Sequence, residues 1–253
     1  MLGEEDLQSS AEAVREWVEE PSLPADGMFP HPTRKNDAIA GLTTILVTYA
    51  FAHKLIAAVW TKVETMETSG NGDGFVLFAG LARAFPDRAA ELAQRLRRGL
   101  VADDPDVSGN AGAALYHWLK AAEEEPSLPR VADDLVQEIG TAVAARRRGT
   151  LQVALELSCW LLDEGPVRYR SLVKEGCEHG LSYLVEELAY SATTAREAVG
   201  DLDVPLLRKK CARLAVAMDR AGYGTGRGVR AWIEAAATDP LPEVRNVVRG
   251  ALE

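Results

Sequence analysis

The stretch TDPLPEVRNVVRGAL (Thr238–Leu252) decides the fold, because it joins the end of one helix to the start of another. Proline is costly inside a helix and well tolerated in its first turn, so the Asp-Pro-Leu-Pro run predicts a helix break followed by a new helix. Apolar side chains then follow at Val244, Val248 and Leu252, which is the spacing of one helix face. We expect Asp239 to accept hydrogen bonds from free backbone N–H groups at the start of the second helix.

Three other stretches repeat this acidic turn followed by an apolar residue, and in two of them Arg comes next. They are VADDPDVSGNAGAAL (Val101–Leu115), LLDEGPVRYRSL (Leu161–Leu172) and GDLDVPLLRKKCARLA (Gly200–Ala215). The apolar anchors are separated by 60, 40 and 37 residues: Val107, Val167, Leu207 and Val244. The last two intervals fit a helical repeat of about 40 residues. The first interval implies an insertion or an unrecognised unit.

The turn and second helix of this pattern resemble a HEAT repeat, clearly in DPLPEVRNVVRGAL and more weakly in DEGPVRYRSLV and DDPDVSGNAGAAL. The resemblance covers residues 99–253 and implies an all-α fold, in which antiparallel helical hairpins stack as an α-solenoid. It also implies a non-enzymatic scaffold or complex subunit, whose concave face of second helices binds a protein partner. Before this region we expect a helix over 1–20, a Pro-rich linker over 21–36 and a helical part or cap over 37–98.

By their position in the motif, four arginines are candidates for partner binding on or near that concave face: Arg168, Arg208, Arg245 and Arg249. The alternative is a structural role, in which the arginines pair with acidic turn residues of neighbouring units: Asp163, Asp203 and Asp239. An Arg245→Ala substitution separates the two interpretations. A structural role predicts lower thermal stability with unchanged affinity for the partner, and a binding role predicts the reverse.

The composition indicates a helical and acidic protein. The chain has 253 residues, of which 47% are hydrophobic and 6% aromatic, with a formal net charge of −10 and a pI near 5.0. An acidic surface repels phosphate backbones, which disfavours broad nucleic-acid binding and suits a cytoplasmic protein. The alternative function is a HEAT-like nucleic-acid-binding protein or DNA glycosylase-type enzyme, which requires a basic groove and a catalytic acid.

The sequence predicts no catalytic residue, no metal site and no cofactor. The cysteines form no Cys-x-x-Cys, so neither a disulfide framework nor a zinc site is expected: Cys159, Cys177 and Cys211. Cys177 and His179 are close in sequence, but residues i and i+2 point to different sides of a helix. The glycine-rich run GYGTGRG (Gly222–Gly228) follows a helix rather than a strand and lacks the lysine of a phosphate loop. We expect it to link two hairpins.

Basic and aromatic residues give further expectations. The run Arg146, Arg147 and Arg148 is expected to end a helix, where the helix dipole favours cations, and it is also a possible patch for an acidic partner. The tryptophans are expected in the core between repeats: Trp17, Trp60, Trp118, Trp160 and Trp232. Residues 167–192 are expected to hold two helices. The C-terminal helix could dock another subunit.

Residues 38–60 contain the longest apolar run of the chain. Its first 15 residues carry no charge, but His53 and Lys54 then interrupt it. A membrane-spanning helix needs about 20 apolar residues, so we expect a buried helix. Membrane docking through this segment is a further alternative function. The start MLGEEDLQSS lacks the basic residues and apolar run of a signal peptide, which favours a cytoplasmic location.

Overall fold

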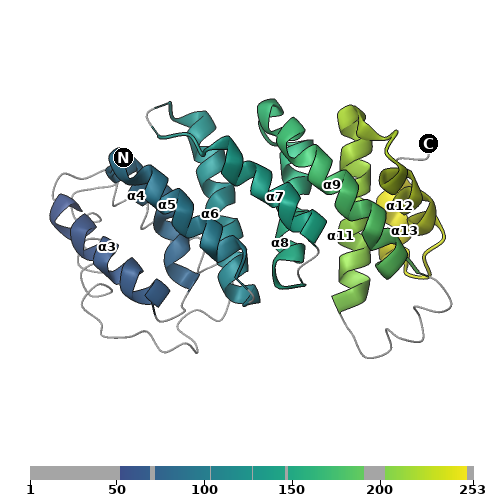
Figure 1. The fold of residues 1–253 in the computed structure, drawn as a ribbon, viewed down its shortest axis with the longest axis horizontal. Coiled ribbons are helices and arrows are strands. Elements are labelled where there is room, and N and C mark those ends of the chain that lie inside the picture. The colour runs from purple at the N-terminus through teal and green to yellow at the C-terminus, as the bar shows by residue number, and fades with distance from the viewer. Residues whose placement is uncertain are drawn as a thin grey trace, which may run out of the picture. The chain divides into compact units, whose positions relative to one another are not determined.

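A computed structural model describes residues 52–68, 72–102, 104–126, 128–145, 148–190 and 203–249. Every regular element in these ranges is a helix, as the composition predicts (Figure 1). The expected helix over 1–20, the Pro-rich linker over 21–36 and residues 37–51 lie outside the described residues, and so does Trp17. The fold prediction is therefore confirmed at the level of an all-α protein.

The chain divides into two compact units. The first comprises residues 1–100 and 109–130, and the second comprises residues 101–108 and 131–253. The described helices of the first unit are α3 (Ala52–Thr68), η1 (Gly72–Leu77), α4 (Phe78–Ala84), η2 (Pro86–Arg88), α5 (Ala89–Leu100) and most of α6 (Pro105–Glu124). Helix α6 begins within the residues of the second unit and continues into the first.

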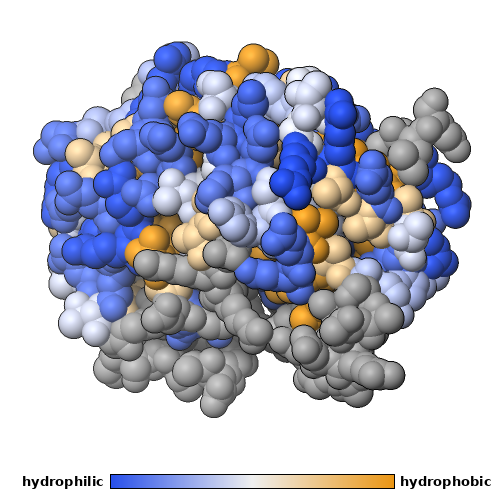
Figure 2. Space-filling model, turned by 45° about the vertical axis from the view of Figure 1, so that its right-hand side comes forward, coloured by the Kyte–Doolittle hydropathy of each residue, from blue (hydrophilic) through white to orange (hydrophobic). Residues whose placement is uncertain are grey.

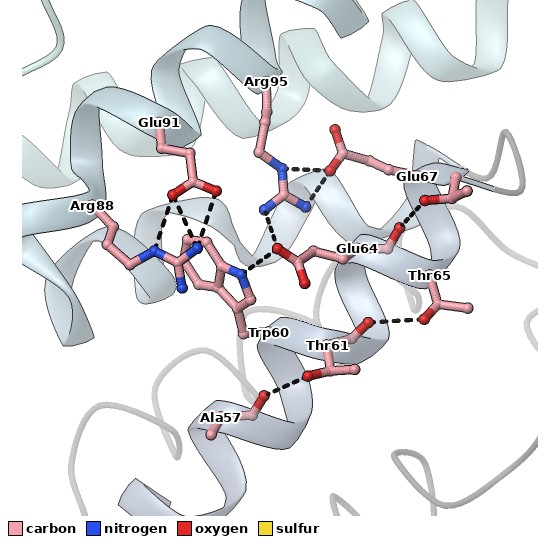
Figure 3. Close-up of polar contacts among 10 residues, drawn as sticks. Ala57, Trp60, Thr61, Glu64, Thr65, Glu67, Arg88, Glu91 and Arg95 are labelled. Carbon is pink, nitrogen blue, oxygen red and sulfur yellow. Dashed lines mark hydrogen bonds and ion pairs between the residues drawn. The ribbon is translucent and has the colours of Figure 1, made fainter.

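Trp60 is the centre of a polar and aromatic cluster in the first unit (Figure 3). Its ring packs edge to face on Phe85, with the ring centroids 5.6 Å apart, and its indole N–H donates to Glu64 Oε1 at 2.7 Å. The guanidinium carbon of Arg88 lies 3.4 Å from the centroid of the Trp60 ring. Glu91 holds that guanidinium through two hydrogen bonds of 3.0 and 3.1 Å. The indole thus receives a cation that a carboxylate keeps in place.

Arg95 of α5 ties that helix to α3. Its side chain is only 4% exposed. Its Nε donates to Glu67 Oε2, and its Nη1 lies 4.0 Å from Glu64 Oε1 (Figure 3). A buried guanidinium requires such a partner, because an unpaired charge inside a protein costs several kcal/mol, on the order of 3–5 when one partner is removed.

Trp118 anchors the turn that follows α6. The indole N–H of Trp118 donates to the carbonyl oxygen of Pro129 at 2.8 Å. Leu128, between them, is buried, and its N–H donates to the Glu125 carbonyl at 3.0 Å. Glu125 also forms an ion pair with Arg83 of α4. These contacts fold the chain back after proline has ended the helix.

The described residues of the second unit form three pairs of helices in chain order. They are α7 (Asp133–Ala145) with α8 (Arg148–Asp163), α9 (Val167–Leu188) with α11 (Asp203–Met218), and α12 (Arg227–Ala237) with α13 (Pro242–Arg249). The π-helix η3 (Asp219–Tyr223) continues α11.

The packing of these pairs follows a regular order. The first helices pack on one another, α7 on α9 and α9 on α12, and the second helices do the same, α8 on α11 and α11 on α13. Figure 1 shows α7 and α9 lying side by side. Within the described residues, no extensive contact joins the first pair to the third.

Glycines bring α7 and α9 into backbone contact. A Cβ added to Gly176 would lie 2.3 Å from the carbonyl carbon and oxygen of Gly140. A Cβ added to Gly180 would lie 2.7 Å from the backbone oxygen of Val143. Both distances are far below a normal carbon contact, so only glycine allows the two helices to approach this closely. Gly228 likewise allows α12 to approach α9 closely. A Cβ added to Gly228 would lie 2.6 Å from the backbone nitrogen of Ser182 in α9.

Two expectations about helix boundaries are wrong. The segment expected to hold two helices forms one helix, Val167–Leu188, because the packing of Gly176 and Gly180 against α7 offsets the weakness of glycine in a helix interior. The run of three arginines begins a helix at its one described member, because Arg148 is the first residue of α8. Its other members, Arg146 and Arg147, lie outside the described residues.

Candidate functional site

A pocket of about 280 Å³ lies between α8 and α11 of the second unit. Its lining residues are Leu155, Glu156, Cys159, Trp160, Asp163, Glu164, Lys210 and Arg213. Pockets for small molecules usually measure roughly 300–1,000 Å³. This pocket therefore lies at the lower limit of that range and has room for one large side chain.

The sequence builds this pocket from one face of each helix. Glu156, Trp160, Asp163 and Glu164 follow at intervals of four, three and one residues, which places them on one side of α8 and its end. Trp160 is half-buried, so its expected place in the core is only partly correct. The described tryptophans that match that expectation are buried: Trp60, Trp118 and Trp232. Trp160 therefore supplies aromatic surface to the wall of the pocket.

Charges of both signs line the pocket. Lys210 Nζ lies 2.8 Å from Glu156 Oε1 and donates to Gln152 Oε1 at 3.2 Å. Asp163 and Glu164 are exposed at the C-terminal end of α8, where the helix dipole adds partial negative charge. Arg213 is exposed on the α11 side. Since Lys210 balances Glu156, the remaining lining charges are two carboxylates and one guanidinium.

The thiols of the second unit are buried and protonated. Burial raises the pKa of Cys159 and of Cys177 to about 12, and it also raises the pKa of Cys211. A thiol is a nucleophile only as the thiolate, so none of these three is activated at neutral pH. Cys177 is buried and His179 is exposed on the same helix, which confirms that they point to different sides.

Arg208, a partner-binding candidate, is instead buried in an ion pair. Its Nε donates to Asp239 Oδ2 at 2.8 Å, and the two residues are 6% and 2% exposed. Asp239 belongs to the turn of the next helical pair, so the expected contact between an Arg and an Asp of the neighbouring unit is confirmed for this residue. Asp239 Oδ1 also accepts from the backbone N–H of Leu241 at 2.8 Å, as expected for the start of α13.

Arg245 contacts the same turn as Arg208 does. Its Nη1 donates to the carbonyl oxygens of Asp239 and Pro240. Arg168 is exposed at the start of α9, and its Nη2 donates to the Tyr169 hydroxyl at 2.9 Å. The structure therefore brings two of the four candidates to Asp239, Arg208 to its carboxylate and Arg245 to its backbone carbonyl.

The other residues of the motif differ among the copies. Arg249 is exposed on α13. Asp104 accepts from the N–H of Asp106 at 2.8 Å at the start of α6, and Asp103 lies outside the described residues. Asp163 is exposed at the end of α8, and it lines the pocket.

The glycine-rich run forms the wall of a second, shallow pocket of about 490 Å³. Gly222 has a φ of 85°, a left-handed conformation that favours glycine. Arg230 Nε donates to the Gly224 carbonyl at 3.3 Å, and two carboxylates, Asp219 and Glu234, also line this pocket. Two carboxylates against one guanidinium disfavour phosphate, and the run connects α11 and η3 to α12.

The described surface is largely polar. Figure 2 shows a face on which hydrophilic residues predominate and hydrophobic residues form small groups between them. The large hydrophobic residues that are exposed in the described ranges are Val101, Val167, Tyr183, Tyr190 and Leu206. None of them lines the pocket between α8 and α11.

Three further results bear on function. Within the described residues, no group of three or more His, Cys, Asp or Glu side chains is arranged to hold a metal ion. None of the helices in the described ranges combines the length and the apolar character needed to cross a membrane. No protein-family model, curated protein or solved structure matches the chain.

Sequence reasoning missed Trp160, Lys210 and Arg213 as a group, because they come from helices 50 residues apart. A signal for half of the pocket was present, since Trp160, Asp163 and Glu164 share the i, i+3, i+4 spacing. The partner helix could not be inferred, because its pairing with α8 depends on the packing of the hairpins.

Proposed function

We propose that the chain is a HEAT-like α-solenoid that binds a protein partner on the layer formed by α8, α11 and α13. The observation that supports this most is the packing order of the second unit, in which each helical pair contacts the next. Repeat proteins stack their units in this way, and the stack offers an extended surface for recognition.

The contacts of the arginines separate residues that stabilise this layer from residues that can bind a partner. Arg208 is buried and Arg245 closes a turn, so both stabilise the stack rather than meet a partner. Trp160 and Arg213 line the pocket with their surfaces partly open to solvent. Tryptophan and arginine are the residue types most enriched where binding energy concentrates in protein interfaces. These two residues are therefore our partner-binding candidates, together with the exposed Arg249 of α13. Arg168 is exposed as well, but it lies on α9, outside this layer.

A pull-down of the tagged protein from the native host's lysate, with and without nuclease, tests this function. We expect a stoichiometric protein that survives nuclease and is lost when Trp160→Ala and Arg213→Ala are combined. Tyr183→Ala is the control, since Tyr183 is an exposed aromatic residue on α9. Each variant must retain the wild-type melting temperature.

Two results would overturn the proposal. Recovery of nucleic acid, with proteins lost after nuclease treatment, would favour the nucleic-acid-binding alternative. A protein partner bound equally by the combined variant and by the Tyr183→Ala control would exclude the layer of α8 and α11 as the binding surface.

A further inference from the structure

We propose that the pocket between α8 and α11 receives a lysine or arginine side chain from a basic segment of the partner. This inference rests on the proposed function and names the chemistry of its partner. The cation would lie against the indole of Trp160, near the carboxylates of Asp163 and Glu164. The aliphatic part of the same side chain would contact Leu155.

The residues of α8 supply the groups that such a cation requires. Trp160 lines the pocket with an indole, the aromatic ring whose face attracts cations most strongly. Asp163 and Glu164 follow three and four residues later, so their carboxylates lie next to that ring on the helix surface. The C-terminal end of α8 adds its partial negative charge at the same place.

The charges within the pocket also favour a cation. Lys210 is 2.8 Å from Glu156 and thereby balances it. Asp163 and Glu164 then outnumber Arg213, which leaves an excess of negative charge in the lining. The whole chain carries a formal net charge of −10, so a basic segment is attracted over a long range as well.

The first unit shows that this combination holds a guanidinium in this protein. There the guanidinium carbon of Arg88 lies 3.4 Å from the Trp60 ring centroid, and Glu91 grips it with two hydrogen bonds (Figure 3). The shared feature is an indole with a carboxylate nearby, since Glu91 comes from α5 and Trp60 from α3. At about 280 Å³, the pocket has room for one side chain of this size.

Three fluorescently labelled octapeptides, which differ at two positions only, probe the pocket directly. One carries two arginines among glycine and serine residues, and the others carry citrulline or glutamate in the same places. Citrulline keeps the shape of arginine without its charge. Binding is measured by fluorescence anisotropy at low and at physiological ionic strength, because salt screens exposed charges.

The decisive variant is Asp163→Asn combined with Glu164→Gln, which keeps the shape and removes two charges. Its matched control is Glu175→Gln combined with Glu186→Gln, which removes two exposed carboxylates from α9. We expect the pocket variant to weaken binding of the arginine peptide about tenfold or more, a loss equivalent to about 1.4 kcal/mol. The control variant should change the affinity for the arginine peptide less than about twofold. Replacing arginine by citrulline in the peptide should weaken binding as much as the pocket variant does.

The inference is overturned if the arginine peptide does not bind, if the glutamate peptide binds more tightly, or if both variants weaken binding equally. Equal weakening would mean general charge attraction with no pocket involved. These results are separate from the pull-down. A partner captured through Trp160 and Arg213, together with no preference for arginine peptides, would leave the proposed function standing and remove this inference alone.

Discussion

Replacing Gly176 with alanine adds one methyl group at the place where α7 and α9 touch. The new Cβ would lie 2.3 Å from the carbonyl carbon and oxygen of Gly140 and 2.8 Å from its Cα. All three are backbone atoms of a helix, so no side chain can rotate to make room. The two helices must therefore move apart, and the contact that joins the first two helical pairs is weakened.

The expected cost follows from two opposing effects. Alanine is better than glycine in a helix interior by about 1 kcal/mol. Overpacking costs about 1–3 kcal/mol. The upper half of that range applies because the new Cβ is attached to the backbone of α9 and meets the backbone of α7. The net loss in the free energy of unfolding is then about 1–2 kcal/mol, which raises the population of opened molecules roughly 5–30-fold.

The cysteines make this measurable for the second unit alone. All three cysteines of the chain are buried there. Their labelling by a thiol reagent under native conditions reports how often this unit opens. We expect Gly176→Ala to accelerate labelling roughly 5–30-fold, in proportion to the opened population.

Gly109→Ala is the matched control, because a Cβ at Gly109 would meet nothing within 4 Å and this residue lies in the first unit. It should stabilise α6 by about 0.5–1 kcal/mol and leave thiol labelling unchanged. If Gly176→Ala labelled at the wild-type rate, α7 and α9 would not be held in backbone contact. The Gly140→Ala/Gly176→Ala double variant should lose less free energy of unfolding than the two single variants lose in total. One separation of the helices relieves both clashes.

Further substitutions test an ion pair, a turn and a buried thiol. Arg208→Ala should lower the free energy of unfolding by about 3–5 kcal/mol, because it leaves Asp239 buried without its partner. Arg249→Ala on the surface should change that free energy by less than about 0.5 kcal/mol. Thermal melting distinguishes the two variants. Trp118→Phe removes the donor to the turn after α6 and should cost about 1–3 kcal/mol in urea unfolding. Burial raises the pKa of the Cys177 thiol from 9.0 to about 12, so its contribution to stability is intact below pH 9 and is lost as the pH rises toward 12. Cys177→Ala should make that decline shallower, as measured by urea unfolding on either side of pH 9.

The sequence was most informative where helices start and stop. The prolines and the acidic residue at Asp239 correctly predicted a helix break, a hydrogen-bonded helix start and an Arg partner in the preceding unit. The helix break and the helix start depend on neighbouring residues, and the Arg follows the acidic turn in three of the four copies, so a single chain reveals them. The all-α fold followed from the same signals.

The sequence was least informative where two helices meet. Gly176 and Gly180 suggest a weak point in a helix, and only the position of α7 explains why they lie inside a continuous one. Arg208 has the same motif position as the exposed Arg168, yet it is buried, because Asp239 approaches it from the next helical pair. The pocket was missed for the same reason, since its two walls come from α8 and α11.

The ion pair of Arg208 with Asp239 also has a consequence for biosynthesis. The two residues are 31 positions apart, and Arg208 leaves the ribosome first. At about 5–20 residues per second, roughly 2–6 seconds pass before Asp239 follows. During that interval α11 cannot bury its guanidinium without leaving a charge unpaired. Burial of Arg208 is therefore expected to wait for the turn that holds Asp239, so that translation sets the earliest moment at which α11 can settle.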